Sequence, residues 1–446
     1  MVSPPPLVQT VKKLYQNCKV KIKVGKTFAE VDYTTGVHQG DNMSPVLFLF
    51  VIQAFLDTLK LSSKPIHFSY FPENKNGNPH TIKGRLVSQN TTARGKPFNF
   101  NSSFYVDDSF FVFETIEELR QAIVELDQHF SRFGLIMHLG SETSKSKSEA
   151  MFFPSSLKQA RLDYDNNILP NDLQLPSNKK VHFVKNFKYL GSTITPLLNE
   201  DAEIDIRIRK AKSIMGASKH FFDNRDIGKK IKAEIYIAGP LNALLWGCEA
   251  WNLTKNNLKR IMSFHHSAIR RILNIRWDQV REKHIKNHEV RGLLCGMPNI
   301  DAYINKRTAT YIGKISRSNS TSYPKKFLTA WIHGKKKNGH PQLTCNNNYA
   351  KVIEKIMPNN KPLSNKQAPL KEWLPLAVDE SNWMQCIDDY FNSCRNIINL
   401  DELDPKNMNE AEPESENNEV EETEPVSLSP LSSTLSPPPS RTLDTR

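Results

Sequence analysis

Two adjacent carboxylates, Asp107 and Asp108, stand in the middle of the segment FNFNSSFYVDDSFFVFET. Strand-favouring residues flank the pair on both sides, which predicts a β-hairpin that presents the acidic side chains at its turn. Neighbouring carboxylates hold divalent cations, and divalent cations catalyse phosphoryl transfer between nucleotides. The segment therefore predicts a metal-dependent site that acts on phosphates.

A glycine-containing turn, GVHQGDNMSP at residues 36–45, precedes this segment. Its glycines allow close backbone approach, and the amide of Gln39, directly before Gly40, is suited to contact a nucleotide or a template strand. Alone, such a turn before a capped helix is usually structural, but its position upstream of the acidic pair makes the combination more specific. Ser44 and Pro45 match an N-cap and a first helical residue, and the apolar run after them predicts a helix buried against a sheet.

The surrounding elements indicate how the acidic pair is positioned. Residues 61–103 are rich in Asn, Gly, Pro and Ser, which predicts a long irregular connection or a hairpin insert. The run from Thr115 to Phe133 has apolar residues at helical spacing behind a Thr-x-x-Glu capping box. Strand, helix, hairpin and helix in this order indicate an α+β layer arrangement.

The charge of the chain favours a polyanionic partner. The formal net charge is +13, and residues 401–446 hold twelve acidic and three basic side chains, so residues 1–400 carry +22. Such an excess suits phosphates, whose binding releases counterions. On charge alone, a basic protein with solvated side chains is an equally good interpretation.

The sequence shows no signal for secretion and no segment long enough to cross a membrane. Six cysteines show no C-x-x-C pair, which indicates reduced thiols and neither a disulfide framework nor a zinc ribbon. The N-terminus has no secretory signal, and the most apolar stretch, Val46 to Leu59, falls short of the roughly 20 residues that cross a membrane. We expect an intracellular protein with no membrane contact, in either the nucleus or the cytoplasm.

Four segments, in order, resemble the reverse transcriptases of non-LTR retrotransposons of the long interspersed element type. GVHQGDNMSPVLF resembles that family's motif B and FYVDDSFFVF its motif C. FGLIMHLGSETSKSKSEAMFF resembles motif D, and NFKYLGSTIT resembles the primer-grip motif E. The run from Leu244 to Trp277 is similar to the thumb and connection, and HGKKKNGHPQLTC to a basic segment near the end of such polyproteins. The resemblance covers about residues 5–350.

The resemblance implies an α+β fold, with a reverse-transcriptase-like polymerase palm followed by a mainly helical thumb and connection region. The expected boundaries are 1–155 for a partial palm with motifs B, C and D, and 156–196 for a loop and primer-grip hairpin. A basic helical thumb and connection would span 197–330, and a basic C-terminal segment 331–400. Residues 401–446 form an acidic tail rich in Ser and Pro, which we expect to be disordered because it cannot bury enough apolar surface.

By resemblance the activity is RNA-directed DNA polymerisation with Mg²⁺ (or Mn²⁺), an RNA template, a DNA primer and deoxynucleotides. Asp107 would bind the metal ions, with Asp108 as a second ligand or support, because adjacent strand residues point to opposite faces unless the turn redirects both. Lys147 would supply charge or a proton to the departing pyrophosphate, although a solvated lysine in a Ser- and Lys-rich loop is an equal alternative. The residues that would contact the nucleotide or template are Gln39, Gly40 and Tyr105, and those of the primer grip are Tyr189, Leu190 and Gly191.

One expected element has no counterpart in the sequence. Family members carry fingers and a motif A aspartate upstream of the segment that begins this chain, and Asp32 lies in the wrong element to replace it. We therefore expect an isolated chain that is catalytically incomplete, unless a separate polypeptide supplies the fingers. The alternatives are a non-catalytic protein that binds nucleic acid or a partner, and an unstable fragment that aggregates through an unpaired sheet edge.

The basic second half holds two histidine pairs and an amphipathic stretch. His284 and His288, and likewise His265 and His266, lack a cysteine pair, so we expect solvated or phosphate-facing side chains rather than metal ligands. Between Lys255 and Arg291, Lys and Arg alternate with apolar residues. This pattern suits a thumb that tracks a duplex, and it also suits ordinary surface helices.

Overall fold

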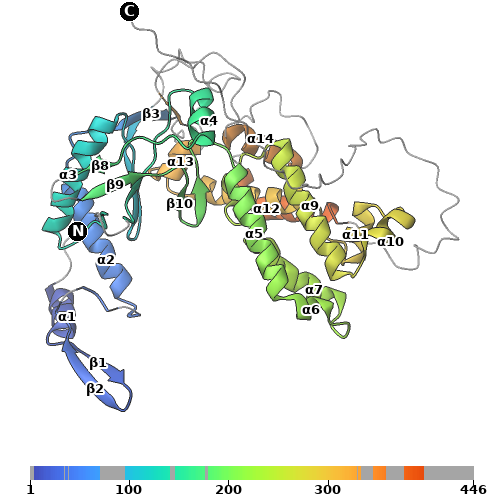
Figure 1. The fold of residues 1–446 in the computed structure, drawn as a ribbon, viewed down its shortest axis with the longest axis horizontal. Coiled ribbons are helices and arrows are strands. Elements are labelled where there is room, and N and C mark those ends of the chain that lie inside the picture. Colours follow the sequence, from blue (N-terminus) through green and yellow to red (C-terminus); the bar gives the residue numbers. More distant parts are fainter. Residues whose placement is uncertain are drawn as a thin grey trace, which may run out of the picture. The chain divides into compact units, whose positions relative to one another are not determined.

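The computed structural model describes residues 5–34, 36–38, 40–70, 96–140, 146–175, 179–328, 330–332, 345–357 and 376–395. Contacts divide the chain into residues 1–398 and 399–446, and all described residues belong to the first unit. Gln39, the acidic tail and much of the predicted basic segment 331–400 lie outside the described residues. The first half mixes helices and strands, and the second half is mainly helical (Figure 1).

The N-terminal elements contribute no core. Helix α1 (Pro5–Tyr15) buries no residue, and strands β1 (Lys19–Val24) and β2 (Thr27–Asp32) form an antiparallel hairpin. Every residue of both strands is exposed, including Val24 and Phe28. Asp32 ends the second strand of this exposed hairpin, away from any core.

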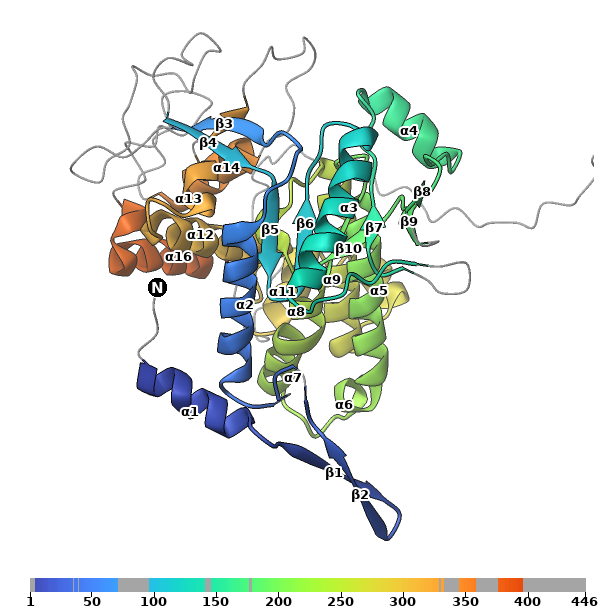
Figure 2. The same cartoon turned by 90° about the vertical axis from the view of Figure 1, so that its left-hand side faces the viewer.

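A compact layer follows, centred on the fully buried Phe55 of helix α2 (Ser44–Thr58). The Phe55 ring lies 6.0 Å from Phe104 of strand β5 (Ser102–Tyr105) and 4.3 Å from Phe130 of helix α3 (Ile116–Arg132). His129 of α3 also hydrogen-bonds the Phe55 carbonyl oxygen, at 3.0 Å. Figure 2 shows α2, β5, strand β6 (Asp108–Phe111) and α3 next to one another.

Two details of helix α2 differ from expectation. The N-cap is Met43, and Ser44 is the first helical residue; the Ser44 hydroxyl donates to the His38 carbonyl oxygen instead of capping the helix. The helix is also less buried than the sequence predicts. Val46 and Phe50 are each 53% exposed, and only Ser44, Ile52 and Phe55 of the helix are buried. The helix packs along one edge, which a nearly uniform apolar sequence does not reveal.

The helix predicted from Thr115 is confirmed as α3. The Thr115 hydroxyl accepts a hydrogen bond from the Glu118 amide, and Glu118 in turn accepts one from the Glu114 amide. Within the segment 61–103, for which the sequence predicts an irregular connection or a hairpin insert, β3 (Ile66–Tyr70) pairs with β4 (Lys96–Phe100) in antiparallel register. Residues 71–95, between the two strands, lie outside the described residues. Strand β12 (Trp331–Ile332) pairs with the free edge of β3.

A small three-stranded sheet follows α3. Strand β9 (Lys180–Phe183) lies between β7 (Glu149–Ala150) and β8 (Leu173–Gln174), parallel to the first and antiparallel to the second. Its buried side chains Val181 and Phe183 pack with Ile123 of α3. Helix α4 (Leu157–Asp165) and the hairpin of β10 (Phe187–Tyr189) with β11 (Ser192–Ile194) complete the first half.

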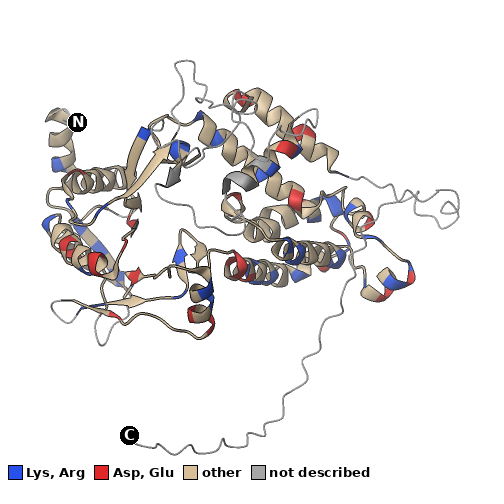
Figure 3. Cartoon of the chain, turned by 90° about the horizontal axis from the view of Figure 1, so that it is seen from above, with Lys and Arg blue, Asp and Glu red and all other residues tan. Residues whose placement is uncertain are grey.

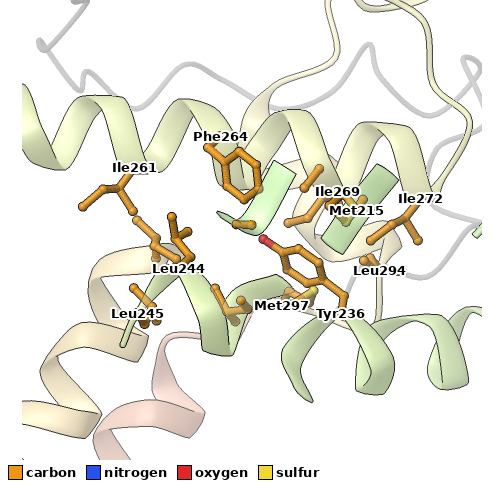
Figure 4. Close-up of a cluster of buried hydrophobic side chains, with 14 of the residues drawn as sticks. Met215, Tyr236, Leu244, Leu245, Ile261, Phe264, Ile269, Ile272, Leu294 and Met297 are labelled. Atoms are coloured by element: carbon orange, nitrogen blue, oxygen red, sulfur yellow. The ribbon is translucent and has the colours of Figure 1, made fainter. Parts of the chain in front are cut away.

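The described residues of the helical half form two hydrophobic clusters. The first runs from α5 to α12 and surrounds the fully buried Tyr236 (Figure 4), and the second surrounds the fully buried Trp383. No helix in the described part of the chain is long and apolar enough to cross a membrane. The elements are α5 (Asp201–Ala217), α6 (Lys219–Asp223), α7 (Lys229–Tyr236), a π-helical turn (Ile237–Leu241), α8 (Asn242–Leu244), a 3-10 turn (Cys248–Ala250), α9 (Lys255–Ile272), α10 (Trp277–Glu282), α11 (Asn287–Leu293), α12 (Ile300–Arg317), α13 (Tyr323–Leu328), α14 (Cys345–Ile356) and α16 (Glu380–Ser393).

The predicted solvation of His265 and His266 was wrong. His265 is fully buried; the Tyr236 hydroxyl donates to its Nδ1 at 2.9 Å, and its Nε2 donates to the Pro298 carbonyl oxygen at 3.3 Å. The buried His266 accepts from the Arg291 guanidinium at 2.8 Å. Both rings are therefore neutral. They belong to the core because the apolar faces of α9 and its neighbours enclose them.

Candidate functional site

The acidic pair lies on the predicted hairpin. Strands β5 and β6 pair from Ser102–Phe111 to Tyr105–Asp108, which leaves Val106 and Asp107 as a two-residue turn. Directly opposed residues share one face of a hairpin, so Tyr105 and Asp108 lie together while Phe104 faces α2. Tyr105, Asp107 and Asp108 are all exposed.

The turn is strained at Val106. Its φ is 57°, whereas turns that join two strands by two residues with one positive φ usually have glycine at that place. A β-branched residue in this region costs roughly 1–3 kcal/mol, which the rest of the hairpin must offset. The tight turn keeps Asp107 and Asp108 at the exposed tip.

A second hairpin meets the face that carries Asp108. The Tyr189 ring of β10 lies 5.3 Å from the Phe110 ring of β6, in an edge-on contact. Burial raises the pKa of Tyr189, a hydrogen bond with Ser103 opposes the rise, and the negative charge of Asp108 adds to it. The predicted primer-grip residue Tyr189 and the predicted metal ligand Asp108 are therefore neighbours, although they are far apart in the sequence.

The turn of this second hairpin has a defined shape. Leu190 and Gly191 are its two central residues, with φ angles of 47° and 84°. Two positive φ values are typical of a type I′ turn, which matches the twist of the paired strands. An ideal Cβ at Gly191 would lie 3.2 Å from Nε1 of Trp246, so this turn lies directly against the loop after α8.

A buried ion pair fastens the second hairpin to α5. Arg207 Nε donates to Glu203 Oε1 at 2.5 Å, and both side chains are almost fully buried. Glu203 also accepts a hydrogen bond from the Thr193 amide at 2.7 Å, and Arg207 donates to the Gly191 carbonyl oxygen. Since each charge has a backbone partner in the hairpin, removing either side chain would leave the other charge buried and uncompensated.

The remaining predicted residues are not brought to the acidic tip by any contact in the described residues. Gly40, with a φ of 93°, is exposed in the turn before α2, and Gln39 lies outside the described residues. Lys147 is exposed, and its backbone amide donates to the His138 carbonyl oxygen. Its predicted role in catalysis stays a prediction.

The acidic pair fits part of a divalent metal site. Exposed carboxylate oxygens are the ligands that Mg²⁺ prefers, and neither aspartate makes an ion pair with another described residue. Two-metal phosphoryl transfer uses more carboxylates than two. Within the described ranges, no group of three or more His, Cys, Asp or Glu side chains is arranged to hold a metal ion. The described residues therefore do not complete such a site.

The helices after this region carry an excess of exposed basic side chains. Between residues 255 and 291, exposed Asp278 and Glu282 are outnumbered by exposed Lys and Arg. Figure 3 marks the Lys and Arg positions of the chain in blue and the acidic positions in red. Arg270 lies over the Trp277 ring at 4.2 Å and stiffens the link from α9 to α10. The exposed basic residues of the stretch are Lys255, Lys259, Arg271, Arg276, Arg281, Lys283 and Lys286.

Two features of the site were not predicted. Glu203 and Arg207 are four residues apart, a spacing that usually marks a pair on a helix surface, and only the flanking isoleucines signal burial. The contact of Gly191 with Trp246 joins segments that no local pattern relates. A glycine in each turn, at positions 191 and 247, is the one sequence signal for this close approach.

Comparison with known proteins adds one relationship. No protein-family model matches the chain. The chain is similar to a Caenorhabditis elegans protein described as uncharacterized and transposon-derived, with 29% identity over 161 residues. The match covers 34% of this chain and 56% of that protein, so the chain spans about half the length of the relative. This similarity supports a transposon-related origin and assigns no activity.

Proposed function

We propose that this chain is the palm and thumb part of a reverse transcriptase of the non-LTR retrotransposon type. The observation that carries the proposal is the contact between the β5–β6 and β10–β11 hairpins, through Phe110 and Tyr189. A polymerase must hold a primer end beside its metal ligands, and these two hairpins are the segments that resemble the family's catalytic and primer-grip motifs. The transposon-derived relative supports the same origin.

In this proposal, the chain's own residues bind and orient the nucleic acid. Exposed Lys and Arg on α9 to α11 contact phosphates of the RNA–DNA duplex, and β10–β11 positions the primer strand next to Asp108. Asp107 and Asp108 would supply two of the carboxylates for Mg²⁺ (or Mn²⁺), which when bound stabilises negative charge on phosphate oxygens. The described residues do not complete the metal site by themselves.

A second candidate is a non-catalytic nucleic-acid-binding protein of the same fold. The carboxylate set of the described residues, which does not complete a metal site, favours it. Under this candidate the exposed basic side chains still bind duplex, and Asp107→Ala leaves the affinity unchanged or slightly raised, because a negative charge is removed near the phosphates.

The test combines binding and primer extension on a poly(rA)/oligo(dT) duplex. With about six phosphate contacts, affinity should fall about 10³-fold between about 50 mM and 200 mM salt. We expect salt-dependent binding without extension by the isolated chain. Extension that disappears in Asp107→Ala would show that the carboxylate site is complete after all, and binding that salt leaves unchanged would refute both candidates.

A further inference from the structure

Trp246 is a half-exposed aromatic side chain in the loop that follows α8. Its exposed fraction is 52%, whereas its chain neighbour Leu245 is fully buried. Single exposed aromatic residues are common on protein surfaces and need no function. What distinguishes Trp246 is how firmly the structure holds it.

Two glycines allow the loop of Trp246 and the β10–β11 turn to approach each other. An ideal Cβ at Gly191 would lie 3.2 Å from Trp246 Nε1 and 3.7 Å from Cε2, and an ideal Cβ at Gly247 would lie 2.9 Å from the Ser192 hydroxyl. Both glycines have positive φ angles, which other residues rarely adopt. The indole therefore rests directly on Gly191, where a Cβ would crowd the ring.

Both sides of this contact are fixed by arginines. Arg207 donates to the carbonyl oxygen of Gly191 on the hairpin side. Arg307 donates to the carbonyl oxygen of Leu245 at 3.1 Å and to Asn242 at 2.8 Å on the loop side. The loop and the turn are thus anchored independently, so a ligand that meets the exposed indole does not have to order it first.

A short chain of contacts connects the indole to the hairpin that carries Asp107 and Asp108. Tyr189, two residues before Gly191, contacts Phe110, and the negative charge of Asp108 helps to raise the pKa of Tyr189. Leu190, between them, is 42% exposed. The loop of Trp246 shares its hydrophobic core with α9, which carries exposed basic residues. Proteins that bind single strands combine such basic segments with exposed aromatic rings on which nucleobases stack.

We propose that Trp246 is a stacking platform for an unpaired nucleobase beside the duplex. A base inside a duplex has both faces covered, so the indole selects an unpaired base. The inference rests on the proposed function and adds a specific nucleic-acid-binding residue to it.

The experiment measures fluorescence anisotropy of the full chain with two labelled RNA–DNA hybrids, one blunt and one with a single-stranded template overhang. Trp246→Ala should weaken binding of the overhang hybrid roughly 5- to 150-fold, and binding of the blunt hybrid less than about twofold. Trp246→Phe, which keeps a ring, should stay within about threefold of wild type. Trp277→Ala removes a second indole of similar exposure, 54%, and should affect both hybrids equally.

The outcomes separate this inference from the proposed function. If wild type binds neither hybrid, the proposed function itself fails. If wild type binds and Trp246→Ala binds the overhang hybrid equally well, or weakens for both hybrids alike, stacking at Trp246 is refuted while duplex binding stands. A loss shared by Trp246→Ala and Trp246→Phe would show that an aromatic ring at position 246 does not account for the binding, and would also overturn the inference.

Discussion

Mild acid should destabilise the helical half through its two buried histidines. Burial, with the charges of His266 and Arg291, lowers the pKa of His265 to about 3, and burial, with the charges of Arg291 and Arg270, lowers the pKa of His266 to about 4. Unfolded histidine titrates near about 6.5. Because the folded pKa values are depressed, the stabilisation is complete above about pH 6.5 and is lost as the pH falls toward about 4 and 3.

The magnitude follows from proton uptake by the unfolded chain. At about 1.36 kcal/mol per pKa unit, lowering the pH from about 7.5 to 5 should cost about 2 kcal/mol for each histidine, or about 4 kcal/mol together. Urea unfolding followed by helical circular dichroism at the two pH values measures this loss. His265→Gln should lose about 2 kcal/mol less than wild type over the same interval, whatever its stability at neutral pH.

The matched control replaces the exposed His284 and His288 by glutamine. These side chains are solvated, so the control should keep the full pH dependence of wild type. Equal pH dependence in wild type and His265→Gln would refute the conclusion that His265 is buried and neutral.

Further predictions concern packing and the buried ion pair. Gly313→Ala places a Cβ 2.5 Å from a ring carbon of the buried Trp383 and should lower the free energy of unfolding by about 1–3 kcal/mol. Gly216→Ala, in open space on α5, should raise it by about 0.5–1 kcal/mol. Thermal unfolding measures the sign of both changes. Arg207→Met should cost about 3–5 kcal/mol, because Glu203 stays buried and uncompensated. Adding Glu203→Leu should recover part of that loss in urea unfolding, and no recovery would contradict the assignment.

The elements predicted correctly depend on local signals. The β5–β6 hairpin follows from alternating strand-favouring residues around a short turn, and helix α3 follows from the Thr115 cap and its apolar spacing. The β10–β11 hairpin, with its turn at Leu190 and Gly191, lies within the segment 156–196 where the family resemblance implied a hairpin. In each case, residues close in the sequence determine the backbone.

The features that sequence did not predict depend on distant contacts. His265 is buried because α9 packs against segments as far away as Pro298, and an isolated helix pattern cannot show which polar side chain such packing encloses. Helix α2 is apolar on most sides, so its sequence does not indicate that only one edge, around Phe55, is covered. The contact of Gly191 with Trp246 joins two turns that are distant in the sequence. Helix α5 lies between them in the chain and contacts both β11 and α8.

The measurement that tests the central claim most directly is a photocrosslink from the primer end. A primer that carries 4-thiothymidine at its 3′ terminus is annealed to an RNA template, bound by the full chain and irradiated, and the crosslinked peptides are identified by mass spectrometry. We predict crosslinks within residues 102–111 or 187–194, which unlabelled template–primer removes by competition. Saturable binding with crosslinks confined to α12, α14 or α16 would contradict the assignment of the two hairpins as the primer site.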